Sequence, residues 1–189
     1  KRKVIDTIAT GRVVSVEREV FPNLLNAGMK VIGVVDEGYW LDLGTPTAFV
    51  KGSSDLVTGK IKTGLIHSFA DKLVLSGAEI DNSSKITNGS VVGINSRVGK
   101  DCEINHSVIA NEVLISEKCV IDSSIIAKGA KIGAGCVIKN SVVADAVELA
   151  AGSVLINDSR IWPDQKVAKI ELNNQNILTI LYIYFHHYT

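Results

Sequence analysis

Short apolar pulses recur through the middle of the chain and end near residue 167. From Ile80 onward an aliphatic residue returns every six positions, and a small residue follows four places after each one. The aliphatic positions are Ile80, Ile86, Val92, Val98 and Ile104, and the small ones are Ser84, Ser90, Ser96 and Cys102. A period this regular is typical of a solenoid, in which each repeat buries against its neighbours what it could not bury alone.

Further along, three pulses together repeat every 17 residues. The blocks 104–120, 121–137 and 138–154 align, and one extra residue, Leu155, precedes a fourth block headed by Ile156. Ser107, Ser124, Ser141 and Ser159 lie three places after the block heads. We expect three sides to each coil, with aliphatic and small side chains inside and glycine or asparagine at the corners. Pro163 lacks an N–H for an interior ladder, so 162–165 is expected to cap the solenoid.

These repeats resemble the left-handed parallel β-helix built of hexapeptide units, over about Ile80 to Val167. The left hand is implied by this resemblance, because crossovers between parallel strands are normally right-handed. The fold class expected is therefore mainly β, a left-handed parallel β-helix preceded by an α/β segment. We place the β-helix at 65–170, the α/β segment at 1–64 and a tail of unknown structure at 171–189.

The first sixty residues carry helix signals on either side of two apolar stretches. Ser15 suits a helix N-cap, with Glu17 in the first turn and Gly28 at the exit. The stretches 30–35 and 38–43 are predicted strands. Thr45 and Pro46 then open a second helix that is predicted to stop at Gly59. This α/β pattern is too short to build a doubly wound sheet by itself.

Charge and cysteine content exclude several classes of protein. Lysine plus arginine and aspartate plus glutamate both number 20, so nothing indicates nucleic-acid or membrane binding. Cys102, Cys119 and Cys136 are odd in number and lie in apolar runs, which predicts buried thiols and a reducing, cytoplasmic setting. The start lacks an apolar core for a signal peptide. The apolar stretch 177–185 is too short to span a bilayer, and a docked terminal strand or a disordered tail would explain it.

The segments "SVEREVFPNLL" and "GYWLDLGTPTAFVKGSSDLVTG", followed by hexapeptide repeats, resemble the C-terminal part of a sugar-phosphate nucleotidyltransferase. The likeness is greatest to mannose-1-phosphate guanylyltransferases, also called GDP-mannose pyrophosphorylases. It covers nearly the whole chain except the last twenty or so residues.

This resemblance implies a reaction in which a nucleoside triphosphate and a sugar 1-phosphate give an NDP-sugar and pyrophosphate, assisted by Mg²⁺. In the family motif of the W-x-D-x-G-T type, the acid binds the metal, and it corresponds to Asp42. Hydrogen bonding of Asp42 to nearby turn amides is the alternative explanation. Glu17 is a second candidate, for sugar contact, although its charge also suits a helix N-terminus.

The family's nucleotide-binding signature, a glycine-rich loop with an Arg and a Lys, does not occur in the sequence. The first metal-binding aspartate and the lysine that contacts the sugar phosphate are missing as well. We therefore predict that the chain is catalytically silent alone, and that its β-helix serves oligomerisation or regulation. The sequence does not identify the nucleotide or the sugar.

Two other functions remain open at this point. Acyltransferases also use the left-handed β-helix, generally with a catalytic histidine at a subunit interface. The candidates are His67, His106, His186 and His187, and His106 is expected on a solvated corner. Zinc would need three convergent histidines, and no histidine recurs at the coil spacing. The other alternative is a non-catalytic assembly subunit that forms a homo-oligomer.

Overall fold

A computed structural model describes residues 2–61, 63–64 and 69–169. The chain divides into two compact units, 1–39 and 40–189, and each is described by itself. In the part of the chain that the structure describes, no helix has the length and apolar character needed to cross a membrane.

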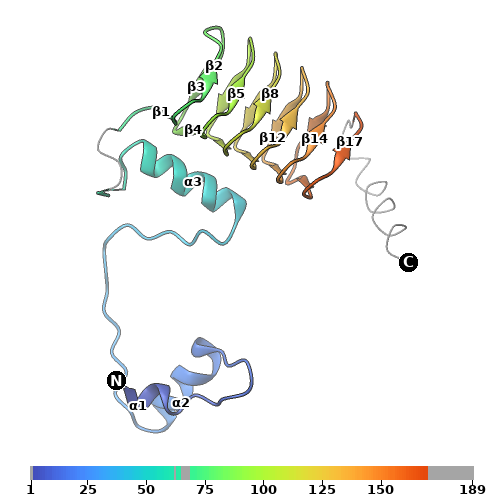
Figure 1. Cartoon of the computed structure of the whole chain (residues 1–189). Helices are drawn as coiled ribbons and strands as arrows, with labels where there is room; N and C mark the ends of the chain where they lie inside the picture. The colour runs from blue at the N-terminus through green and yellow to red at the C-terminus, as the bar shows by residue number, and fades with distance from the viewer. Residues whose placement is uncertain (1, 62, 65–68, 170–189) are drawn as a thin grey trace, which may run out of the picture. The chain divides into compact units, whose positions relative to one another are not determined.

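The first unit is a small helical segment (Figure 1). Helix α1 covers Arg2–Ile5, a π-helical turn η1 covers Val16–Val20, and α2 follows directly at Phe21–Asn26. The Ser15 hydroxyl accepts a hydrogen bond from the Arg18 N–H at 3.1 Å, and Gly28 has a φ of +69° at the exit. The predicted cap and stop are thus confirmed.

The stretches 30–35 and 38–43 were predicted to be strands, and this was wrong. Neither forms a strand, and both are extended without regular structure. A strand needs a neighbour to take up its N–H and C=O groups. No described strand pairs with either stretch, because all the described strands belong to the solenoid.

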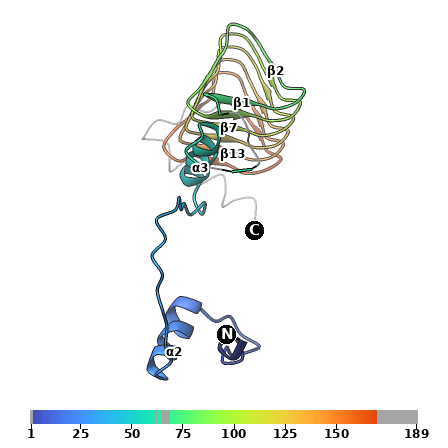
Figure 2. The same ribbon diagram turned by 90° about the vertical axis from the view of Figure 1, so that its left-hand side faces the viewer.

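The first helix of the second unit is α3, Pro46–Val57, and a parallel β-solenoid of about six turns follows it (Figure 1). The Thr45 hydroxyl accepts a hydrogen bond from the Ala48 N–H at 3.2 Å, and Gly59 follows the helix with a φ of +83°. Both predicted helix boundaries are confirmed. Seen end-on in Figure 2, the coils stack into a three-sided outline, as the six-residue period predicts.

Each side of the solenoid is one parallel sheet. The first, face A, contains β1 (Lys72–Val74), β4 (Ser90–Val92), β7 (Val108–Ile109), β10 (Ile125–Ile126), β13 (Val142–Val143) and β16 (Arg160–Ile161). The second, face B, contains β2 (Glu79–Ile80), β5 (Arg97–Val98), β8 (Leu114–Ile115), β11 (Lys131–Ile132), β14 (Glu148–Leu149) and β17 (Lys166–Val167). The third, face C, contains β3 (Lys85–Thr87), β6 (Glu103–Asn105), β9 (Val120–Asp122), β12 (Val137–Lys139) and β15 (Val154–Leu155). The fold class is mainly β, and the solenoid is consistent with the left-handed β-helix that the repeats resemble.

The core is a set of ladders of aliphatic side chains, one from each face. On face A the inward ladder runs through Val92, Ile109, Ile126 and Val143, all fully buried. The serines after the corners form a second ladder, in which the hydroxyl of Ser107 accepts the N–H of Ser124 at 3.1 Å. These inward positions are the ones that the sequence period predicted.

The two coil lengths have a common cause at the corner between faces C and A. In the coils near the two ends of the solenoid, two residues in the left-handed conformation make this corner: Asn88 with Gly89, and Asn157 with Asp158. In the central coils a single residue in the left-handed conformation makes it, namely His106, Ser123 or Asn140. The shorter corner removes one residue from the coil, so partners lie 18 residues apart in the pair Lys72–Ser90 and 17 in Val91–Val108.

Two details of the predicted repeat are wrong. Leu155, read as the extra residue, pairs with Ile138 and is fully buried, so it is the inward residue of its coil in place of Ile156. The extra residue lies in the Asn157–Asp158 corner. Pro163 does not cap the solenoid either, because β17 continues beyond it and the Glu148 N–H donates to the Gln165 carbonyl at 2.8 Å.

The three cysteines stack inside the solenoid on successive coils and are unpaired. The Cys102 sulfur lies 3.0 Å from the Ser116 carbonyl oxygen, and the Cys136 sulfur lies 3.3 Å from that of Ala150. A thiolate there would face carbonyl lone pairs, so we assign all three as protonated thiols. Hydrogen bonding between the stacked thiols raises the pKa of Cys119 and lowers those of Cys102 and Cys136, while burial acts to raise all three. The assignment of three protonated thiols therefore rests on the carbonyl contacts and on burial.

We expect Ellman's reagent to find no reactive thiol in the native chain at pH 8 and three after unfolding in denaturant, since the thiolate is the reactive form. The release of thionitrobenzoate measures this directly. Rapid modification of the folded protein would contradict the assignment of these cysteines to the core.

Candidate functional site

The candidate metal residue Asp42 lies in the extended segment before α3. It is exposed, and its carboxylate accepts a hydrogen bond from the Gly44 N–H at 2.9 Å. This is the turn contact that the sequence offered as the alternative to a metal role. The contact occupies one carboxylate oxygen and leaves the side chain open to solvent, so it is compatible with a further ligand.

The leucines on either side of Asp42 position this segment on α3. A methyl group added to Gly52 of α3 would lie 2.8 Å from a methyl carbon of Leu43 and 3.4 Å from one of Leu41. Glycine in the helix interior is therefore explained by the close approach of these leucines. The two leucines therefore hold the segment that carries Asp42 against the helix.

Helix α3 is in turn fixed to the first coils of the solenoid. The Ser54 hydroxyl donates to the Asn88 carbonyl at 3.0 Å, and the helix packs against β4. The buried carboxylate of Asp55 forms ion pairs with Lys51 and, at 3.0 Å, with Lys60. Asp42 is thus held at a defined place relative to the solenoid.

The second candidate, Glu17, lies in η1 with an exposed side chain. Glu17 lies in the first turn, where its charge suits the helix N-terminus as expected, and Glu19 in the same turn makes the hydrogen-bonded cap contact. The Glu19 carboxylate accepts from the Ser15 N–H at 3.3 Å and from Arg12 at 2.7 Å, and these contacts lower its pKa. The sequence signal for this contact is a variant of the capping box, in which the acidic residue follows the N-cap serine by four positions in place of the usual three. Glu17 and Asp42 belong to different compact units.

Among the described residues there is no group of three or more histidine, cysteine, aspartate or glutamate side chains that could hold a metal ion. Magnesium often takes only one or two carboxylates from the protein and completes its shell with water and substrate phosphates. Asp42 is exposed and only one of its carboxylate oxygens is engaged by the Gly44 N–H, which is compatible with such a ligand.

His106 is the one candidate for acyl transfer that falls in the described residues, and His67, His186 and His187 lie outside them. It occupies a left-handed corner with a φ of +44° and is half-buried. Its Nδ1 atom lies 3.4 Å from the Asn88 carbonyl oxygen. The predicted corner is confirmed, although the ring is less exposed than expected.

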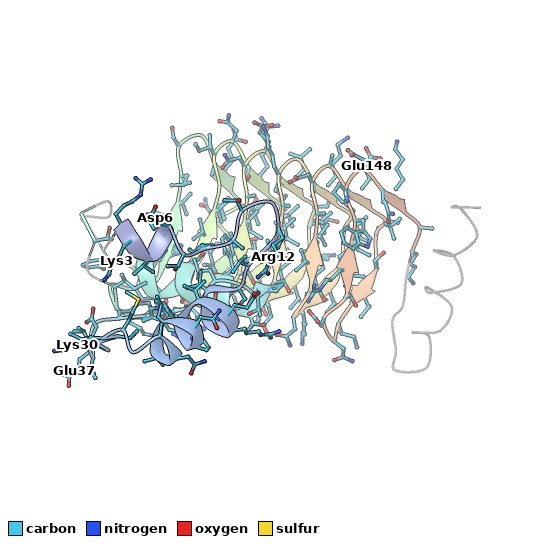
Figure 3. The ribbon with its side chains drawn as sticks, turned by 90° about the horizontal axis from the view of Figure 1, so that it is seen from below. Lys3, Asp6, Arg12, Lys30, Glu37 and Glu148 are labelled. Atoms are coloured by element: carbon cyan, nitrogen blue, oxygen red, sulfur yellow. The ribbon has the colours of Figure 1, made fainter. Side chains whose placement is uncertain are left out.

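Face B carries two shallow hollows, of about 830 and 630 Å³. Some of the charges on their rims form ion pairs: Glu79 with Arg97 at 3.2 Å, and Glu148 with Lys131 at 2.8 Å and Lys166 at 3.1 Å. Hydrogen bonds from the two lysines lower the pKa of Glu148, which Figure 3 labels on the solenoid. The first hollow is also lined by Asp81, Lys100 and Glu117, so it carries charged groups besides these ion pairs.

Residues 69–177 match the family model for the GMPPB C-terminal domain. The chain belongs to this family. The mannose-1-phosphate guanylyltransferase of Mycobacterium tuberculosis is 43% identical over 115 residues, which make up 60% of this chain and 32% of that protein. The chain therefore spans about a third of the length of this curated relative.

Solved structures with similar coils include a mutant of GDP-perosamine N-acetyl transferase from Caulobacter crescentus in complex with CoA and GDP-perosamine. It is 16% identical, with a TM-score of 0.41, and the match covers 49% of this chain and 48% of that one. A putative acetyltransferase from Bacillus cereus is 20% identical, with a TM-score of 0.40, covering 59% of this chain and 84% of that one. At these values the likeness concerns the fold alone.

Proposed function

We propose that the chain is the C-terminal part of a mannose-1-phosphate guanylyltransferase, which joins GTP and mannose 1-phosphate to give GDP-mannose and pyrophosphate. The observation that carries this proposal is the 43% identity over 115 residues to the mycobacterial enzyme, in a chain that belongs to the GMPPB C-terminal domain family. Because the chain spans 32% of that relative, the active site is expected to need residues from a preceding domain.

The extended segment before α3 supports a missing partner domain. It exposes large apolar side chains that soluble proteins normally cover, among them Val34 at 86%, Val35 at 90% and Trp40 at 84%. Unpaired β-branched residues in extended conformation are what a strand removed from its sheet would present. In the complete enzyme we expect this segment to join the sheet of the nucleotide-binding domain.

Asp42 is proposed as a carboxylate ligand of the catalytic Mg²⁺, and Glu17 as a sugar contact. When bound, Mg²⁺ supplies positive charge that stabilises negative charge developing on the transferred phosphoryl group. The contribution of this chain is positional: Leu41 and Leu43 anchor the segment on α3, and the Gly44 N–H orients the Asp42 carboxylate.

The β-helix is proposed to assemble subunits or to regulate the enzyme, in the cytoplasm. Its core consists of aliphatic ladders, and the described part brings no metal-binding cluster together. Unpaired buried thiols support a reducing compartment. The flat sides of the solenoid favour packing against other subunits.

A turnover assay tests the proposal. The full-length protein should release pyrophosphate from GTP and mannose 1-phosphate only when Mg²⁺ is present, and the 189-residue chain alone should release none. Other nucleoside triphosphates and sugar phosphates, tested in parallel, define the specificity. Turnover by the isolated chain would overturn the proposal that the site is shared with a preceding domain.

The same samples discriminate the acyltransferase alternative. An acyltransferase would bind coenzyme A and consume acetyl-CoA, with His106 as the candidate base. We expect neither, because the His106 Nδ1 atom already lies near the Asn88 carbonyl within the coil stack. Binding of coenzyme A that is lost in His106→Ala would instead establish acyl transfer.

A further inference from the structure

Face A differs from the other two faces in the chemistry of its outward side chains. In each strand the residues on either side of the buried position point outward, giving two columns along the solenoid. The first column is aliphatic and half-exposed: Val91, Val108, Ile125 and Val142. The second consists of small residues, Gly93, Ala110, Ala127 and Ala144. Over β4, β7, β10 and β13, neither column carries a charge.

The corresponding columns on the other faces are mixed or charged. On face B the first column reads Glu79, Arg97, Leu114, Lys131, Glu148 and Lys166. On face C both columns include charged residues, among them Lys85, Glu103, Asp122 and Lys139. The uncharged strip is therefore a feature of face A and not a consequence of the repeat itself.

The chain already covers one end of this strip. Helix α3 packs against β4 with Val50 and Val57 buried, and a Cβ on Gly89 would collide with the Ser54 hydroxyl at 2.2 Å. Figure 2 shows α3 beside the side of the solenoid that carries β1, β7 and β13. The apolar columns continue past β4 through β7, β10 and β13. Helix α3 therefore covers only the beginning of the strip.

We propose that face A between β7 and β13 is the surface through which two copies of this chain associate. This inference rests on the assembly role proposed for the β-helix and names the face that performs it. An uncharged strip provides nothing to select a charged partner, whereas an aliphatic column beside a small-residue column is complementary to itself. The formal net charge of zero also means that two copies do not repel each other.

The size of the strip sets the strength of this association. Three strands about 4.8 Å apart and two outward positions per strand give a strip of roughly 200 Å². A standard interface buries about 800 Å² per partner, so the strip alone supports a weak dimer. Exposed Ile94 and Trp162 lie next to its ends and add apolar area.

Sedimentation velocity of the 189-residue chain tests the proposal, from about 5 to about 500 µM because interfaces below the standard size are weak. The informative variant is Val142→Arg, which copies Arg160, the residue at the same outward position in the next coil. The matched control is Leu114→Arg on face B, which copies Arg97 of its neighbouring coil. Ile125→Lys serves as a second face A variant, and thermal unfolding checks that each variant is folded.

We expect concentration-dependent dimers for the wild type and for Leu114→Arg, with the dissociation constant raised at least about tenfold by Val142→Arg and Ile125→Lys, since each places an unpaired charge in the contact. Dimers that persist in both face A variants would overturn the proposal for this face while leaving an assembly role intact. A wild-type chain that is monomeric throughout would overturn both. Loss of dimers in Leu114→Arg alone would show that the contact lies on face B, and would overturn the proposal for face A.

Discussion

Asp42→Asn in the full-length protein is expected to reduce kcat/KM for GDP-mannose formation by about 10²–10³-fold, the usual effect of losing one group that stabilises transition-state charge. The side-chain amide oxygen introduced by this substitution can still accept the Gly44 N–H bond that Asp42 makes at 2.9 Å. The turn before α3 should therefore survive, and Tm should not change. Initial rates of pyrophosphate release across a range of Mg²⁺ concentrations measure the effect.

The chain offers a close control six residues earlier. Asp36 is also exposed and accepts the Gly38 N–H at 2.8 Å, in the same kind of turn. Asp36→Asn should keep normal turnover, because Asp36 lies outside the motif that resembles the metal site. Equal rates for Asp42→Asn and wild type would contradict the metal-binding role and leave Asp42 with a structural role in the turn.

Ile126→Ala is expected to lower the free energy of unfolding by about 2–5 kcal/mol, through lost burial and the cavity left between coils. Ile126 is fully buried in the face A ladder, where it pairs with Ile109 and Val143. Urea unfolding followed by circular dichroism, at a concentration low enough to keep the chain monomeric, measures the loss.

The adjacent residue provides the comparison. Ile125 has the same side chain but points outward and is half-exposed, so Ile125→Ala should cost less than about 1 kcal/mol in the monomer, as surface substitutions usually do. Similar losses for the two variants would contradict the assignment of inward and outward positions.

The solenoid could be predicted from the sequence because its rule is local and repeats. An aliphatic residue every six positions, with a small residue four later, fixes which side chains point inward. The three cysteines and the serine ladder were placed correctly by the same rule. The 17-residue blocks were also visible, although only the structure shows that a one-residue corner such as His106 is their cause.

The errors arose where this rule leaves a choice. Leu155 and Ile156 are both aliphatic and adjacent, so the sequence does not say which one faces inward. Pairing of Leu155 with Ile138 decides it. Pro163 lacks an N–H, but it lies in a corner between β16 and β17, where no ladder bond is required of it.

The neighbourhood of the candidate site was only partly predictable. The motif around Asp42 pointed to a turn and a capped helix, and both are present. Gly52 beside Leu43, and Asp55 between two lysines, depend on packing between segments, which the sequence pattern does not encode. The predicted strands at 30–35 and 38–43 failed because strand formation requires partner strands that the described residues do not provide.

The intact mass of the natural protein, purified from its source, decides whether this chain is part of a guanylyltransferase. We expect a single polypeptide heavier than the 20.2 kDa of this chain by on the order of 200 residues, the usual size of one further domain. A natural mass equal to that of the 189-residue chain would contradict the guanylyltransferase proposal. The protein would then be a β-helical assembly subunit.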